Sequence, residues 1–262
     1  VEVKVCPHSG REVSASFPPG VEAPTQYSPR FNAWLVYLRA QQLIPLERIR
    51  QMAADLFGAP TSEATVQNAV ATTFHALQTF ETRVADLLAR SSIVHADETG
   101  VRVAGKLHWL HVAGTKLLTW HGLSRRRGME AIQHFAVLTR FTGRLVHDCL
   151  SAYFQLDCRH GLCNAHLLRE LVFLFEVQRQ TWAKTMFLLL RRMHRAIQSQ
   201  KDRAGPQAAV QLAAWTAKYR AVLLEGFAEN PILSPPAPRR RGRPKHSKAQ
   251  NLLLRLREHE TS

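Results

Sequence analysis

The chain has 262 residues, 45% of them hydrophobic, which is enough to bury a sizeable core in one large domain or two small ones. Its 35 Lys and Arg against 20 Asp and Glu leave a formal net charge of +15, which favours a polyanionic partner such as nucleic acid over a merely basic soluble protein. The four cysteines lack paired spacings and the longest apolar runs are far shorter than the roughly 20 residues of a membrane span, which argues against a disulfide framework and a transmembrane helix.

The N-terminal segment, residues 1–30, is rich in proline and is expected to be loop-like. It has no basic flank followed by an apolar run, so we predict no secretory signal and expect a soluble cytoplasmic protein. Because the first residue is valine, we expect the chain to begin inside a longer reading frame.

Residues 31–90 are predicted to be helical, because their apolar residues recur at helical spacing. Pro45 suits the first turn of a helix that stops at Gly58, and a further helix is expected from Glu63 to about Ala89. A helix, a glycine-centred turn and a capped helix are also the pattern of a helix-turn-helix, so a DNA-binding regulator is one alternative. The second helix lacks early Arg or Lys, which favours a helical hairpin packed against the catalytic domain instead.

Residues 91–160 change to a strand pattern. Three apolar segments with short turns, SIVHADETGVRV, KLHWLHVAG and KLLTWHGLS, predict three strands. GMEAIQHFAVLTRF predicts a helix, and GRLVHDCLSAYF begins as a fourth strand. Residues 161–230 return to three predicted helices, and residues 231–262 combine a Pro-rich break, a basic run and an amphipathic segment.

Two acids stand where an apolar strand run ends, Asp97 in the first strand and Asp148 in the fourth. Three hairpin-linked strands, a helix and a fourth strand resemble the start of the ribonuclease-H-like fold, in which the first and fourth strands lie side by side. Two facing carboxylates repel unless a divalent cation separates them, and Mg²⁺ prefers such ligands. The alternative is that both acids are solvated turn residues. His95 shares a strand face with Asp97 and could tune this site.

Six phrases in order resemble the insertion-sequence-66 family of bacterial transposases, which use a catalytic triad of two Asp and one Glu. The strongest are HADETGVRVAGKLHWLHVAGT, RRRGMEAI, GRLVHDCLSAYF and CNAHLLREL, and the resemblance covers nearly the whole chain. It implies an α/β fold with a ribonuclease-H-like core, a helical N-terminal segment and a large helical insertion.

The resemblance also implies a function. Asp97 and Asp148 would be the first two acids of the triad and would hold Mg²⁺ or Mn²⁺. The partners would be double-stranded DNA, at element ends and target, with accessory proteins of the same element and a homo-oligomer, and no membrane. A non-catalytic DNA-binding protein derived from a transposase is the alternative.

The sequence departs from the family pattern at both ends. The third acid belongs to an Asn-Asn-x-x-Glu-Arg motif that residues 1–262 do not contain, so we expect a truncated copy that is inactive alone. Glu258 and Glu260 are interpreted as solvated helix residues, and Glu170 as part of the inserted helical region. Residues 1–30 resemble the remnant of a zinc-binding region, because CPHSG carries one cysteine of a Cys-x-x-Cys pair.

Two further groups of residues are candidate binding sites. Cys163 and His166 share a helix face and are predicted to be structural, or zinc ligands if a further ligand exists, while Arg169 could contact DNA phosphate. The basic run around Gly242 and Pro244 resembles an AT-hook, which inserts arginines into the minor groove; the alternative is a solvated basic linker. Its predicted DNA-binding residues are Arg239, Arg240, Arg241, Arg243 and Lys245.

Overall fold

The computed structural model describes residues 3–17, 19, 21, 26–199, 206–232 and 246–261. The chain divides into two compact units, Val1–Thr82 and Arg83–Ser262, which are described separately below. Within the described ranges, no helix is both long enough and apolar enough to cross a membrane.

The first unit combines a small hairpin with a helical cluster. Strands β1 (Val3–Val5) and β2 (Glu12–Ser14) pair antiparallel, although we predicted a loop there. The turn forms because Gly10 adopts a φ of 66°, a left-handed conformation that costs glycine little, and the two strands have three residues each and bury no side chain.

Three helices form the core of the first unit around Leu35, Ile49 and Val66. They are α1 (Pro29–Val36, continued by a π-turn at Tyr37–Gln41), α2 (Leu46–Phe57) and α3 (Glu63–Ala76). Gly58 ends α2 with a φ of 59°, as the sequence predicted, and the Ser62 hydroxyl caps α3 by accepting a hydrogen bond from the Thr65 amide at 3.1 Å.

The single helix predicted from Glu63 to Ala89 is interrupted at Leu77, where α3 ends and α4 (Gln78–Ala89) begins. The Leu77 amide faces the carbonyl groups of both Thr73 and His75, and Leu77, with φ −86° and ψ −1°, lies at the break between the two helices. Neither glycine nor proline marks the interruption in the sequence, so local pattern could not have placed it.

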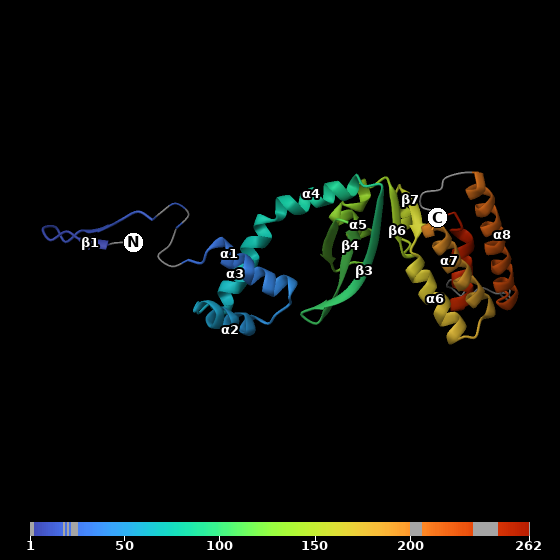
Figure 1. The fold of residues 1–262 in the computed structure, drawn as a ribbon, viewed down its shortest axis with the longest axis horizontal. Helices are drawn as coiled ribbons and strands as arrows, with labels where there is room; N and C mark the ends of the chain where they lie inside the picture. Colours follow the sequence, from blue (N-terminus) through green and yellow to red (C-terminus); the bar gives the residue numbers. More distant parts are fainter. Residues whose placement is uncertain are drawn as a thin grey trace, which may run out of the picture. The chain divides into compact units, whose positions relative to one another are not determined.

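A mixed five-stranded sheet is the centre of the second unit, in the order β5-β4-β3-β6-β7 (Figure 1). The strands are β3 (Ile93–Val103), β4 (Lys106–Gly114), β5 (Thr119–Ser124), β6 (Arg144–His147) and β7 (Arg159–Leu162). The first three form an antiparallel meander, and β3, β6 and β7 run parallel. The predicted adjacency of the first and fourth strands is therefore confirmed, whereas β7, a four-residue strand without an apolar run, was missed.

One face of the sheet carries the core of this unit, because alternate residues of β3, Val94 and Ala96 among them, are buried there. Helices α4 and α5 (Met129–Phe135) supply the other side of this core. The helix predicted through residue 141 ends early, because Ala136 turns left-handed with a φ of 54° and only a 3₁₀ turn, Leu138–Arg140, follows.

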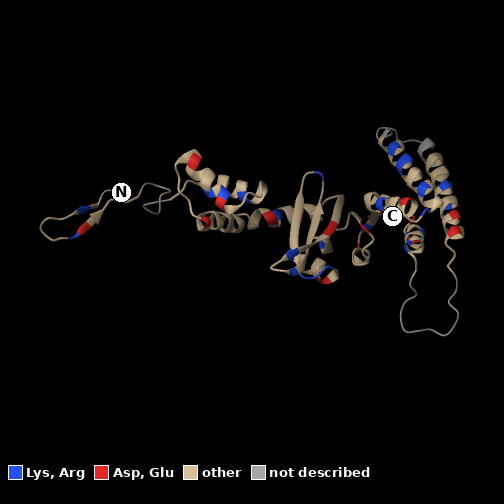
Figure 2. Cartoon of the chain, turned by 90° about the horizontal axis from the view of Figure 1, so that it is seen from below, with Lys and Arg blue, Asp and Glu red and all other residues tan. Residues whose placement is uncertain are grey.

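Four helices follow the sheet and share a second core in which Trp182, Met186, Leu171 and Leu253 are fully buried. They are α6 (Asn164–Glu176), α7 (Thr181–Ser199), α8 (Pro206–Glu229) and α9 (Lys248–Glu258), and all four match predicted helical segments. Leu162 of β7 packs against the same core, which joins the helices to the sheet. Basic residues occur in both units, and α7 contains four Lys and Arg but no Asp or Glu (Figure 2).

Candidate functional site

The sheet register brings Asp97 and Asp148 together. Ile93 pairs with Arg144, Val94 with Leu145 and His95 with Val146, and continuing this register by two residues sets Asp97 opposite Asp148. β6 ends at His147, so Asp148 lies just beyond the strand, at the carboxyl edge of the sheet. The side chain of Asp97 is 57% exposed and that of Asp148 is 21% exposed, so both carboxylates can meet a solvent-borne ligand.

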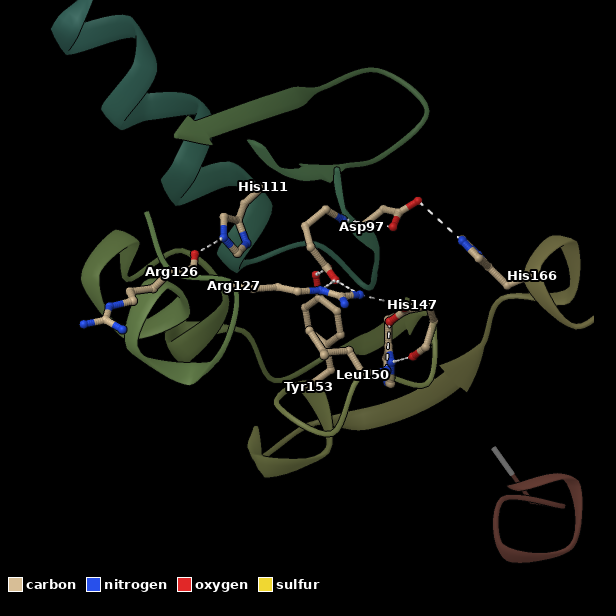
Figure 3. Close-up of polar contacts among 10 residues, drawn as sticks. Asp97, His111, Arg126, Arg127, His147, Leu150, Tyr153 and His166 are labelled. Carbon is tan, nitrogen blue, oxygen red and sulfur yellow. Dashed lines mark hydrogen bonds and ion pairs between the residues drawn. The ribbon is translucent and has the colours of Figure 1, made fainter. Parts of the chain in front are cut away.

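Each of these two carboxylates has one oxygen held by the backbone. Asp97 Oδ1 accepts a hydrogen bond from the Glu98 amide at 2.9 Å, and Asp148 Oδ1 accepts one from the Leu150 amide at 2.9 Å. The other oxygens face basic groups, because Asp97 Oδ2 lies 3.8 Å from His166 Nε2 and Asp148 Oδ2 lies 3.8 Å from Arg127 Nη2 (Figure 3). The backbone therefore orients both acids, and the second oxygen of each faces a basic side chain.

Glu98, next to Asp97, points to the opposite, buried face of the sheet, and its side chain has no exposed surface. Its carboxylate accepts hydrogen bonds from Arg127 Nε at 2.8 Å and from the Tyr153 hydroxyl at 2.6 Å. Arg127 Nη2 also lies 2.7 Å from Glu98 Oε1. The Arg127 guanidinium carbon lies over Trp109, 4.8 Å from the ring centroid. Burial, and then the neighbouring Glu98 carboxylate, raise the pKa of Tyr153 above its ordinary value, so the phenol stays protonated and donates.

This buried network positions the cationic side chain that faces Asp148. Sequence analysis missed Glu98, Arg127 and Tyr153 as site residues. One signal was available, because Glu98 falls at an inward-facing position of the strand, where an unpaired carboxylate would be costly. Nothing in the local sequence identifies Arg127 and Tyr153 as its partners, since they lie far along the chain.

Three cavities of the second unit are lined by residues that the sequence predicted to be functional. The first, of about 260 Å³, is lined by Asp148, Arg127 and Glu170, and the second, of about 480 Å³, by His95 and Asp97. Cys163 and His166 line both, so the fold brings Asp97, Asp148, Cys163 and His166 together. Arg169 lines a third cavity, described below. The predicted DNA-binding residues Arg239, Arg240, Arg241, Arg243 and Lys245 lie outside the described residues.

Cys163 and His166 lie at the start of α6, where the His166 amide donates to the Cys163 carbonyl at 3.1 Å. The buried Nδ1 of His166 has no hydrogen-bond partner among the described residues. Cys158, five residues before Cys163, packs against the sheet core. In the described part of the chain, no three His, Cys, Asp or Glu side chains are arranged to hold a metal ion.

The donor set at the sheet edge still fits a hard divalent cation in part. Asp97 and Asp148 supply two carboxylates from neighbouring parallel strands, and Mg²⁺ is commonly held by one or two carboxylates with water completing its shell. Glu170 lines the cavity of Asp148, but Arg255 binds its carboxylate bidentately, with one of the two contacts at 3.1 Å. Of the two C-terminal acids, Glu258 is exposed as expected, whereas Glu260 pairs with Arg220 at 2.7 Å.

The cysteines allow a simple test of the geometry near these cavities. Burial raises the pKa of the Cys149 and Cys158 thiols, whereas hydrogen bonds from Ser9 and the local backbone lower the pKa of Cys6. The thiolate is the reactive form, so below the ordinary pKa of 9.0 we expect iodoacetamide to modify Cys6 first and Cys149 and Cys158 last. Peptide mass spectrometry over time measures the order, and in urea the difference should vanish. Equal rates in the folded protein would contradict the burial of Cys149 and Cys158.

Comparison with known proteins gives a family match over most of the chain. The family model described as "Transposase IS66 family" matches residues 24–262. No curated protein matches the sequence. A solved structure titled "CryoEM structure of simian T-cell lymphotropic virus intasome in complex with PP2A regulatory subunit B56 gamma" aligns at 15% identity and a TM-score of 0.24, over 85% of this chain and 68% of that chain.

Proposed function

The chain belongs to the IS66 family of transposases, and on this premise we propose that its second unit is a ribonuclease-H-like core for metal-dependent cleavage and strand transfer of DNA. The observation that supports this most is the parallel pairing of β3 and β6, whose last pair, His95 and Val146, lies two residues before Asp97 and Asp148. An antiparallel meander followed by two parallel strands on the other side of its first strand is the strand order expected of such a core.

In this proposal Asp97 and Asp148 hold the divalent cation, Mg²⁺ or Mn²⁺. The bound cation would activate the attacking oxygen and stabilise the leaving oxygen in phosphoryl transfer. The Glu98 and Leu150 amides keep the two carboxylates in place, and the network of Glu98, Arg127 and Tyr153 holds a guanidinium beside Asp148. A fixed positive charge at that position would also stabilise negative charge on a phosphate that is being transferred.

The proposed substrate is double-stranded DNA, at the ends of a mobile element and at its target. The net charge of +15 supports this, because cationic side chains bind phosphates by displacing counterions. We propose that the basic run that includes Arg239, Arg240, Arg241, Arg243 and Lys245 adds sequence-tolerant DNA affinity. Accessory proteins of the same element and a homo-oligomer remain part of the same proposal.

A titration with Mn²⁺ tests the acid pair directly. Electron paramagnetic resonance of the purified chain should detect a bound Mn²⁺ ion. Asp97→Asn and Asp148→Asn should each weaken its binding by at least about ten-fold, the loss typical even of second-sphere changes. Asp157→Asn is the matched control, because Asp157 is an exposed aspartate in the same region that lines neither acid cavity. Equal Mn²⁺ affinity in all four proteins would refute the proposed metal ligands.

One observation favours the alternative, a non-catalytic DNA-binding protein derived from a transposase. The Arg127 guanidinium, 3.8 Å from Asp148 Oδ2, already supplies this carboxylate with a positive partner. The alternative predicts DNA binding that Mn²⁺ does not affect, together with no nicking of an element-end duplex. Metal-dependent nicking that Asp148→Asn abolishes would exclude it.

A further inference from the structure

A third cavity, of about 420 Å³, lies between α6 and α9 and is not used by the acid pair. Its polar lining consists of three cations and one carboxylate, with a single amide: Arg169, Lys248, Arg255, Glu170 and Asn251. Glu170 and Arg255 also line the cavity of Asp148, so the two cavities adjoin. We call the cavity between α6 and α9 the α6–α9 groove.

The charges of the α6–α9 groove do not cancel. Arg255 and Glu170 neutralise one another in a bidentate pair, and the Arg255 side chain is only 28% exposed. Lys248 lies over the Phe173 ring, with its ammonium 4.2 Å from the ring centroid. Neither Lys248 nor Arg169 has a carboxylate partner within the described residues. Two cations are therefore left to attract an anion on a surface whose only acid is already paired.

The shape and surroundings of the α6–α9 groove favour an extended polyanion over a single small anion. Its two unpaired cations come from different helices, Arg169 from α6 and Lys248 from α9, and the apolar side chains of Phe173 and Leu174 also line the groove. Glu170 and Arg255 line both the groove and the cavity of Asp148. In the sequence, the basic run of residues 239–245 leads directly into Lys248. Successive phosphates of a nucleic acid strand match such a line of charges.

We propose that the α6–α9 groove binds the phosphate backbone of one DNA strand next to the acid pair, with Arg169 and Lys248 as the phosphate contacts. This inference rests on the proposed function, because that function makes DNA the substrate at Asp97 and Asp148. The inference predicts that the DNA strand flanking the reacting phosphate runs along α6 and α9. The Arg255–Glu170 pair forms the wall shared by the α6–α9 groove and the Asp148 cavity.

Fluorescence anisotropy with a labelled DNA duplex tests the α6–α9 groove. Each phosphate contact makes the slope of log affinity against log salt concentration more negative by about 0.9, so Arg169→Gln with Lys248→Gln should reduce the magnitude of that slope by about two. We expect the affinity of this double variant to fall about ten-fold at physiological ionic strength and equally for unrelated sequences. Lys218→Gln is the matched control, because Lys218 also stacks on an aromatic ring, Trp215, at 5.5 Å but lies outside the α6–α9 groove.

The outcomes separate this inference from the proposed function. An unchanged slope and affinity in the double variant, with a melting temperature equal to that of the unsubstituted chain, would overturn the α6–α9 groove as a DNA site. That result would leave Mn²⁺ binding at Asp97 and Asp148 untouched. A loss of DNA affinity in the double variant but not in Lys218→Gln supports the groove, whether or not Asp148→Asn changes Mn²⁺ binding. A loss of the same size in Lys218→Gln would mean that general positive charge, not the groove, binds DNA.

Discussion

Replacing Glu98 with alanine is expected to lower the free energy of unfolding of the second unit by about 3 kcal/mol. The Glu98 side chain has no exposed surface, and its carboxylate is the acceptor for both Arg127 and the buried Tyr153 hydroxyl. Its removal leaves the Tyr153 hydroxyl without an acceptor and opens a small cavity, while Arg127, whose side chain is 43% exposed, can partly regain water. Urea denaturation followed by circular dichroism measures the change.

The control for this substitution is Glu130→Ala. Glu130 also pairs with an arginine, Arg126, but at 3.3 Å and with both side chains more than two thirds exposed. Such a pair contributes at most about 1 kcal/mol, so Glu130→Ala should have little effect on stability. Equal losses in the two variants would mean that the buried network around Glu98 does not stabilise the fold as described.

The same network predicts an effect on the acid pair. Without Glu98, Arg127 loses the partner that fixes its guanidinium 3.8 Å from Asp148 Oδ2. A double substitution, Glu98→Gln with Arg127→Met, removes both charges and should recover part of the lost stability, because a buried charge without its partner costs more than an apolar replacement of both. Recovery of stability together with a changed affinity for Mn²⁺ would identify Arg127 as a residue that positions Asp148 and not merely a structural one.

Trp182→Ala should destabilise the helical part of the second unit by about 4 kcal/mol, the largest effect that we expect from a single substitution. Trp182 is fully buried at the start of α7, and its indole N–H donates to Gln180 Oε1 at 2.9 Å. α8 approaches so closely that a Cβ at Gly226 would lie 2.9 Å from Trp182 and 2.5 Å from Leu253 of α9. One indole therefore supports the packing of three helices, and the surrounding backbone cannot collapse into the space that it leaves.

Leu188→Ala is the control on the same helix, because the Leu188 side chain is 55% exposed. Its effect should stay within about 0.5 kcal/mol. Since α9 forms one wall of the α6–α9 groove, Trp182→Ala should also weaken DNA binding under conditions in which α9 has detached. A stable Trp182→Ala protein with normal urea denaturation would show that the helices do not depend on this contact.

Local pattern alone predicted most of the helices and four of the five strands in the sheet of the second unit. The alternation of apolar residues at 93–103 and the apolar run before Asp148 are each set by which side chains face the core, so they are readable along the chain. β7 was missed because its four residues, Arg159–Leu162, owe their strand conformation to the edge of β6 and not to any pattern of their own. The interruption at Leu77 was also missed, because neither glycine nor proline marks it in the sequence.

The sequence by itself determined which residues are candidates for the chemistry, because Asp97 and Asp148 each follow an apolar run and six ordered phrases carry the family resemblance. Only the tertiary structure decided how they are arranged. The last parallel pair of β3 and β6, His95 and Val146, lies two residues before Asp97 and Asp148, and Arg127 and Tyr153 reach Glu98 across long stretches of chain. The α6–α9 groove needs two helices that are distant in sequence. The reason is physical: periodicity reports the face on which a residue lies, whereas hydrogen bonds and charge pairs depend on which faces meet.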